Sequence, residues 1–175
     1  MILDSGERTV FATGAVRDVQ SDEKGRMDLV PIGIVGAIMG DSILVNIDLY
    51  IRTGRKECLV DALKEFAVRN YPDLPSAILD VSLHYSEGAK KYSERNWEKG
   101  IPLSRYVDSM SRHYLKFLRG DTDEPHNRAF MWNVLGAIWT QTNRPEMNDL
   151  PCMEAKKTST DILAEQIEKD GGRNV

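Results

Sequence analysis

Apolar residues recur at helical spacing along most of the chain after residue 30, and this pattern predicts a protein built from helices. A first helix follows Pro31 and is expected to break into two pieces at Gly40-Asp41. Four more helices are predicted over residues 56–69, 73–92, 103–118 and 124–140. In the second of these four, Ile78, Leu79 and Leu83 are expected to pack inward. The fold class is therefore all-α, a single-domain helical bundle.

The first 30 residues lack this periodicity and are rich in turn-forming and charged residues. We expect an irregular N-terminal arm anchored by Phe11 and Val16. The arm carries four cations on a glycine-containing backbone: Arg8, Arg17, Lys24 and Arg26. Glycine allows close approach of the backbone and a guanidinium suits phosphate oxygens, so the arm could close over a phosphorylated ligand. The alternative is a solvated arm whose arginines pair with surface carboxylates.

The helical domain is expected to span residues 1–142, followed by a C-terminal tail of residues 143–175. Pro145 and Pro151 interrupt the tail, and the amphipathic stretch from Thr160 to Lys169 predicts one short helix. The chain has more amphipathic helix than one small bundle needs to bury. We therefore expect a homo-oligomer.

Composition places the chain among ordinary globular proteins, with 41% hydrophobic and 29% charged residues. The net charge of -4 argues against a dedicated nucleic-acid coat protein, and we expect no stable nucleic-acid binding. Cys58 and Cys152 have no metal-like spacing and fit a reducing compartment. The longest apolar stretch, residues 32–39, is too short to span a bilayer. We expect a cytoplasmic protein without a membrane partner.

Side chains capable of chemistry concentrate between His84 and Asn133. Because the ends of antiparallel helices meet in space, groups far apart in this segment can converge on one cavity. Three carboxylates and a histidine cluster where the last predicted helix begins: Asp121, Asp123, Glu124 and His126. One carboxylate is enough to cap a helix, so a cation that holds the others together is the sharper interpretation.

Several other residues of this segment have two interpretations. Glu87 and Lys91 are spaced as a surface ion pair, or they serve as a metal ligand and a phosphate contact. Trp97 either packs on the core or stacks on a base. His113 is either structural or a neutral imidazole that contacts a ligand. Asn133 stands in an apolar stripe and needs a partner, either a backbone group or a ligand.

Five ordered blocks of residues resemble the phage dATP/dGTP diphosphohydrolase-like domain family, in the neighbourhood of the all-α MazG-like nucleotide pyrophosphohydrolases. The family pattern has TGAVRD, then GKGRxDLxP, EGAxKYxxRNWxKG, SxxRH, and DExH leading to WN. The corresponding blocks here are residues 13–18, 24–31, 87–100, 109–113 and 123–133. Together they touch most of residues 8–140.

This resemblance implies metal-dependent hydrolysis of a purine deoxynucleoside triphosphate to the monophosphate and pyrophosphate, in phage nucleotide metabolism. The cofactor would be Mg²⁺ or Mn²⁺, with Glu87, Asp123 and Glu124 as ligands. Glu87, His113 and His126 would be catalytic. The substrate-binding residues would be Arg17, Lys24, Arg26, Lys91, Asn96, Trp97, Arg112 and Asn133.

The chain also departs from the family pattern. Residues 40–75 lie between the second and third blocks and predict an inserted helical hairpin. Pro125 stands where the family often has an acidic residue, and the paired ExxE and ExxD carboxylates of MazG enzymes are not evident. These differences leave an alternative from another class, a non-catalytic protein that sequesters a nucleotide signal of host antiphage defence. A plain helical assembly module is a third interpretation.

Overall fold

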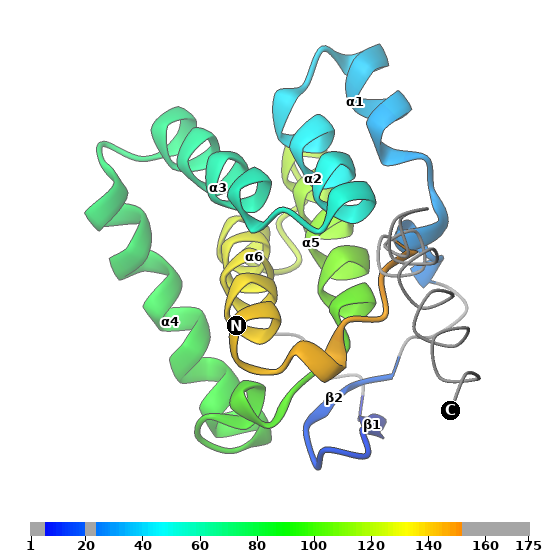
Figure 1. Cartoon of the computed structure of the whole chain (residues 1–175). Helices are drawn as coiled ribbons and strands as arrows, with labels where there is room; N and C mark the ends of the chain where they lie inside the picture. The colour runs from blue at the N-terminus through cyan, green and yellow to red at the C-terminus, as the bar shows by residue number, and fades with distance from the viewer. Residues whose placement is uncertain (1–5, 20–23, 152–175) are drawn as a thin grey trace, which may run out of the picture.

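The structure, a computed structural model, describes residues 6–19 and 24–151 and is helical apart from one short hairpin (Figure 1). The α-helices of this part of the chain are α1 Ile32–Met39, α2 Ser42–Thr53, α3 Lys56–Asn70, α4 Leu74–Tyr92, α5 Leu103–Arg119 and α6 His126–Asn143. Single 3₁₀ turns are η2 Met27–Leu29, η3 Asn96–Lys99 and η4 Pro145–Met147. The predicted all-α class is confirmed. Among the described helices, none has the length and apolar character needed to cross a bilayer.

The N-terminal arm is more regular than expected, because it contains a two-stranded antiparallel hairpin. Strand β1 (Arg8–Val10) pairs with β2 (Val16–Asp18), with Thr9 opposite Arg17. Gly14, at a positive φ of 79°, lies in the turn between the strands. The hairpin lies at the end of the bundle where α4 ends and α5 begins (Figure 1).

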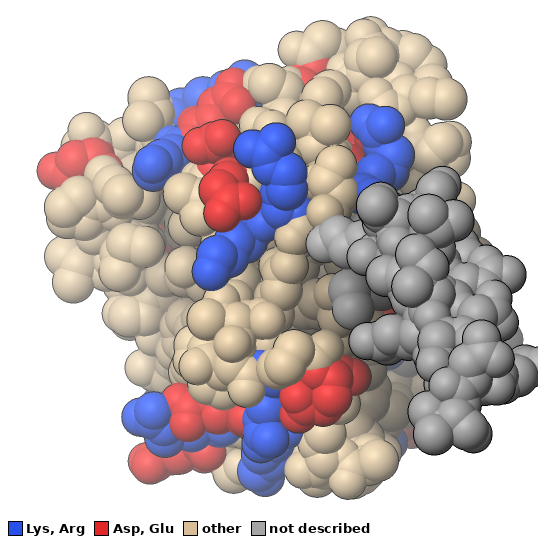
Figure 2. Space-filling model, in the orientation of Figure 1, with Lys and Arg blue, Asp and Glu red and all other residues tan. Residues whose placement is uncertain are grey.

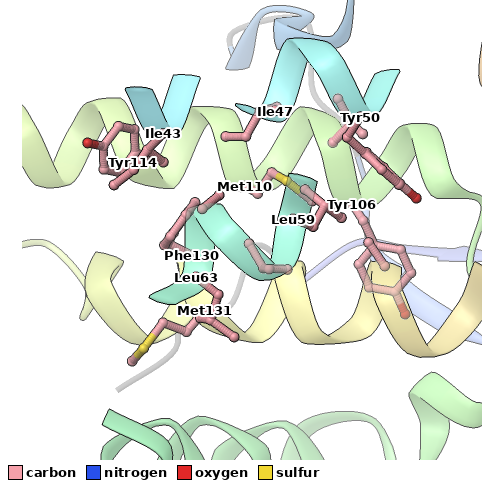
Figure 3. Close-up of a cluster of buried hydrophobic side chains, with 14 of the residues drawn as sticks. Ile43, Ile47, Tyr50, Leu59, Leu63, Tyr106, Met110, Tyr114, Phe130 and Met131 are labelled. Carbon is pink, nitrogen blue, oxygen red and sulfur yellow. The ribbon is translucent and has the colours of Figure 1, made fainter. Parts of the chain in front are cut away.

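Helices α5 and α6 form an antiparallel pair at the centre of the molecule, and α6 also contacts α3 and α4 (Figure 1). Side chains from four helices meet in the core shown in Figure 3: Ile43 and Tyr50 from α2, Leu59 from α3, Tyr114 from α5 and Phe130 from α6. All five are at most 1% exposed. The predicted hairpin at residues 40–75 thus contributes directly to the core, while its status as an insertion stays a prediction.

The predicted break at Gly40-Asp41 is confirmed and has a clear physical cause. Gly40 ends α1 in the left-handed region, with φ at 63°. Asp41 then caps α2, since its Oδ1 accepts a hydrogen bond from the Leu44 N–H at 3.0 Å. Its Oδ2 accepts from the Tyr114 hydroxyl at 2.6 Å, which ties the start of α2 to α5.

The expectation that Ile78, Leu79 and Leu83 pack inward is wrong. These side chains are 41%, 72% and 48% exposed, and α4 buries Ala77, Val81 and His84 instead. The buried residues are spaced four and three apart and so form one stripe along the helix. Ile78, Leu79 and Leu83 lie off that stripe.

The C-terminal part of the chain is described as far as Pro151. The predicted helix at residues 160–169 lies outside the described residues. The division between domain and tail near residue 142 stays a prediction, although α6 does end at Asn143.

Charged side chains of both signs are mixed on the face shown in Figure 2, without a large region of one sign. Many of the described charges form ion pairs, such as Arg52 with Asp48 at 2.6 Å and Arg128 with Asp80 at 2.8 Å. Candidate ligand-binding cations are therefore sought beside a cavity and not among the paired charges of the surface.

Candidate functional site

A cavity of about 930 Å³ opens between β2, the segment around Lys24, α4, η3, α5 and α6. Its volume lies at the upper end of the range for small-molecule sites. Four aromatic side chains contribute to its wall: Tyr85, Tyr92, Trp97 and Trp132. Cations from several elements face the same space, among them Arg17, Lys24, Arg105, Arg112 and Lys116. An aromatic wall combined with cations suits a ligand that has both a flat ring and negative charge.

The arm that forms one side of the cavity is tied to the helices by side-chain contacts. The Asn96 side chain accepts from the Val16 N–H at 2.9 Å and donates to the Val16 carbonyl at 2.7 Å. Arg112 donates to the carbonyl oxygens of Lys24 and Gly25, both at 3.1 Å, and to Asp108 at 2.6 Å. Asn96 and Arg112, both predicted to bind substrate, line the cavity and also hold the arm in place.

Arg17 lies on β2 of the arm, and its side chain forms part of the cavity wall. Its guanidinium carbon lies 5.5 Å from the ring centroid of Trp132 and 5.3 Å from that of Tyr106, a cation–π arrangement. Nη2 donates to Oδ1 of Asn133 at 2.5 Å, while Nη1 is buried without a hydrogen-bond partner among the described residues. Burial lowers the pKa of Arg17. A buried guanidinium edge that lacks a partner is suited to an anionic ligand.

Asn133 has a backbone partner, one of the two kinds that the sequence left open, and it also has a side-chain partner. Its Nδ2 donates to the Ala129 carbonyl at 2.7 Å, and its Oδ1 accepts from Arg17. The amide lines the cavity and holds the guanidinium against the aromatic floor.

Lys91 and Arg26, also predicted to bind substrate, do not belong to the cavity wall among the residues that the structure describes. The Lys91 Nζ pairs with Asp18 at 2.7 Å, and Arg26 donates to Asp28 at 2.7 Å. Their role in binding stays a prediction, because each would have to exchange a carboxylate for a phosphate.

Trp97 both packs and lines the cavity, so its two interpretations are compatible. Its ring makes edge-to-face contacts with Tyr85 at 5.8 Å and with Trp139 at 4.8 Å between centroids. His84 lies on the same wall, 6.0 Å from Trp132. Burial lowers the pKa of His84 to about 4, and its Nδ1 has no hydrogen-bond partner among the described residues. A neutral imidazole thus faces the ligand space.

Two histidines and a glutamate meet where the end of α5 and the start of α6 come together. Nδ1 of His113 lies 3.0 Å from Nδ1 of His126 and 3.4 Å from Oε1 of Glu124. The same Glu124 oxygen lies 3.6 Å from Nδ1 of His126. His113 and Glu124 line the cavity, whereas His126 is 2% exposed and lies behind them. These three residues form one group whose donor atoms are close enough to hold a metal ion.

The ionisation of this group follows from its burial. Burial, followed by the neighbouring His126, lowers the pKa of His113 well below its ordinary value. Burial raises the pKa of Glu124. Asp123 is more exposed, and hydrogen bonds from Lys116 and then His126 lower its pKa to about 2. The group therefore has a neutral imidazole, His113, on its cavity side, and the ionised carboxylate of Asp123 lies outside the group, against His126.

Glu87, predicted as a metal ligand and catalytic residue, lies on α4 one turn after His84. Its charge acts on His84 and on Arg128. Among the described residues, the groups able to hold a metal are His113–Glu124–His126 and Asp121–Asp123–His126, and Glu87 belongs to neither. The structure brings Asp123 and Glu124 together with histidines, and the metal-binding role of Glu87 stays a prediction.

Sequence reasoning missed several wall residues, of which Tyr85 and Arg105 are examples. A signal for part of this wall was present in α4, where Tyr85, Gly88 and Tyr92 recur at helical spacing on one face. Two large rings separated by a glycine on one helical stripe indicate a surface shaped for a ligand. Arg105 had no comparable signal.

The sequence model of the family described as "dATP/dGTP diphosphohydrolase, N-terminal" matches residues 59–150. No curated protein and no solved structure matches the chain. The matched region runs from α3 to the end of the described helices and includes the His113–Glu124–His126 group and the cavity wall on α4, α5 and α6. The matched family name suggests a diphosphohydrolase acting on purine deoxynucleotides. The chain belongs to the dATP/dGTP diphosphohydrolase N-terminal domain family.

Proposed function

We propose that this chain hydrolyses a purine deoxynucleoside triphosphate, dATP or dGTP, to the monophosphate and pyrophosphate in phage nucleotide metabolism. The observation that carries the proposal is the cavity. Its wall combines aromatic rings, the Arg17 guanidinium, whose Nη1 has no hydrogen-bond partner among the described residues, and the side chains of His113 and Glu124. Membership of a family with this named activity supports it.

The phosphates would bind at the cationic side of the cavity. Arg17 offers Nη1, and Lys24, Arg105 and Lys116 lie on the same wall. Several cations are needed because the triphosphate is highly charged and the negative charge on the leaving pyrophosphate grows as the bond breaks. The purine would stack among the rings of Tyr85, Trp97 and Trp132, since stacking on an aromatic face is favourable for any base.

In the proposed reaction, a water oxygen bonds to the α-phosphorus, and the bond from that phosphorus to the oxygen bridging to the β-phosphate breaks. Pyrophosphate leaves with the electron pair, and the water gives up a proton. His113 is a suitable acceptor for that proton because it is held neutral at the cavity wall. His126 would act from behind, through its contact with His113 at 3.0 Å.

The proposed cofactor is Mg²⁺ or Mn²⁺, and the residues do not fit Mg²⁺ well. Mg²⁺ takes oxygen ligands in octahedral geometry. Here the Asp123 carboxylate already binds His126 and Lys116, and the Glu124 oxygen faces two imidazole nitrogens. No step of the reaction is assigned to the ion.

The proposal is tested by incubating the purified protein with linear and cyclic ribo- and deoxynucleotides, with Mg²⁺, with Mn²⁺ and with chelator, followed by chromatography. We expect dAMP or dGMP and pyrophosphate to appear only with a divalent cation. Intact nucleotide that is recovered only after denaturation would contradict hydrolysis and support the sequestering alternative. Failure to bind any nucleotide would contradict both.

A pair of arginine variants tests whether the cavity is the site. Arg17→Gln removes the partnerless guanidinium edge, and we expect KM to rise at least about tenfold, as for loss of a charge-assisted hydrogen bond. Arg52→Gln is the matched control, because Arg52 is an exposed residue of α2 paired with Asp48. Equal kinetic constants for both variants and the unmodified protein would place the site elsewhere.

A further inference from the structure

We propose that His113, Glu124 and His126 bind one borderline transition-metal ion, with Zn²⁺ as the representative, in preference to Mg²⁺. The inference stands on the geometry of three side chains. It does not rest on the proposed function, and an ion bound at Nδ1 of His113 would exclude that residue as the proton acceptor of the proposed reaction.

The three donor atoms are spaced as ligands of one ion. Their separations are 3.0 Å between the two Nδ1 atoms, and 3.4 and 3.6 Å from these to the Glu124 oxygen. Ligands about 2.0–2.2 Å from a tetrahedral or octahedral ion lie about 2.9–3.6 Å from one another. All three observed separations fall in that range.

A contact on the far side of His126 orients its lone pair toward this point. Nε2 of His126 lies 2.7 Å from Oδ1 of Asp123, and the carboxylate can only accept, so the imidazole proton lies on Nε2. In neutral His126, Nδ1 then carries the lone pair, and it faces His113 and Glu124. Lys116 holds the other Asp123 oxygen at 3.0 Å. A carboxylate behind a histidine is the usual outer support of a metal ligand, which makes Asp123 a positioning residue here.

The donor set selects the class of ion. Two imidazole nitrogens and one carboxylate oxygen suit Zn²⁺ and neighbouring first-row ions, whereas Mg²⁺ requires oxygen ligands. Three protein ligands also leave a coordination position free. That position would face the cavity, because His113 and Glu124 line it while His126 closes the site from behind.

The second group, Asp121–Asp123–His126, is the weaker candidate. Arg119 binds Asp121 through Nε at 2.7 Å, and Lys116 binds Asp123. Both carboxylates therefore already have cations, and the same His126 nitrogen is used by Asp123. The His113–Glu124–His126 group has no such competing lysine or arginine among the contacts of the described residues.

The test is Zn²⁺ binding by the full chain, which is first treated with chelator and dialysed, then incubated with Zn²⁺ and freed of excess metal. We expect about one Zn²⁺ per chain by elemental analysis, not displaced by millimolar Mg²⁺. Co²⁺ should bind at the same site and give a visible absorption spectrum that Zn²⁺ abolishes. Absence of Zn²⁺ binding, or its displacement by millimolar Mg²⁺, would overturn the proposal.

Variants assign the ion to these residues. The side chains of His113 and Glu124 are partly exposed, so the substitutions His113→Asn and Glu124→Gln should leave the fold intact, as measured by circular dichroism. Each should weaken Zn²⁺ binding at least about 100-fold. Asp123→Asn should weaken it about tenfold, as for other outer-shell partners. His84→Asn is the control for Zn²⁺ binding. Of the three histidines of the chain, His84 is the one outside the group, so the affinity for Zn²⁺ should be unchanged. Unchanged affinity in His113→Asn would contradict the assignment.

These results separate the metal site from the proposed hydrolase. Zn²⁺ binding without release of pyrophosphate from any nucleotide would leave the site and contradict only the hydrolase. Hydrolysis of dGTP by protein that fails to bind Zn²⁺ would contradict only the site.

Discussion

His84 shows how burial of a single side chain makes stability depend on pH. The imidazole is 7% exposed beside Trp132, and burial lowers its pKa from 6.5 to about 4, although the nearby Glu87 opposes this shift. Between about pH 6.5 and pH 4, His84 is protonated in the unfolded chain but stays neutral in the folded chain. The free energy of unfolding should therefore fall as the pH drops from about 6.5 to about 4, by at most about 3 kcal/mol from this residue.

Urea unfolding at several pH values in chelator measures this effect. His84→Asn should flatten the profile between about pH 4 and pH 6.5. It should not abolish the slope, because the pKa of His113 is lowered in the same direction. A variant whose profile has the same slope as the unmodified protein would show that His84 does not resist protonation in the folded state.

At the residue scale, the sequence predicted which residue types matter better than it predicted their partners. Asn133 was expected to need a partner, but that partner includes Arg17, which is 116 residues away in the chain. Asn96 likewise bonds to Val16 across 80 residues. Spacing in sequence left Glu87 and Lys91 as either a surface pair or a metal ligand and a phosphate contact, and it gave no sign of the ion pair between Lys91 and Asp18 on the arm. Such long-range contacts depend on how the arm folds back, which no local pattern specifies.

At the scale of elements, the contact between α5 and α6 depends on the absence of a side chain at Gly136. A Cβ there would lie 2.5 Å from Cε1 of Tyr106, a fully buried ring. We expect Gly136→Ala to destabilise the fold by about 1–3 kcal/mol, despite the better helix propensity of alanine. Because Tyr106 also lies under Arg17, its displacement should weaken ligand binding as well.

Gly88→Ala is the matched control for this substitution. Gly88 is also inside a helix, α4, and a Cβ there would meet nothing within 4 Å. Its replacement should stabilise the protein by up to about 1 kcal/mol through propensity alone. Thermal unfolding of the two variants measures the difference, and a Gly136→Ala protein as stable as the Gly88→Ala protein would rule out the steric argument.

Helix boundaries followed from local chemistry and were predicted well. Asp41 and Asp73 cap α2 and α4, while Gly54 and Gly120 end α2 and α5 in the left-handed region. The buried face of α4 was predicted wrongly, because Ile78, Leu79 and Leu83 are not the residues that meet the bundle. Which stripe is buried depends on the shape of neighbouring helices, and hydrophobicity alone does not determine it.

At the scale of the whole molecule, apolar side chains remain exposed on several helices. Ile34 and Ile38, one turn apart on α1, are 62% and 81% exposed, and the adjacent Met39 is 49% exposed. A contiguous exposed apolar face is a frequent feature of subunit interfaces. Homo-oligomerisation stays a prediction, and we expect a second copy of this chain to cover this face of α1.

Light scattering coupled to size-exclusion chromatography measures the mass in solution. The mass of the unmodified protein should exceed the 19.8 kDa of one chain. Ile38→Lys should lower this mass toward that of the monomer, because a charge would be buried in the interface. Val68→Lys is the control, since Val68 is 78% exposed on α3, away from α1 in sequence. A monomeric unmodified protein would contradict oligomerisation. If Ile38→Lys and Val68→Lys dissociate the oligomer equally, the interface is not confined to α1 and also involves α3.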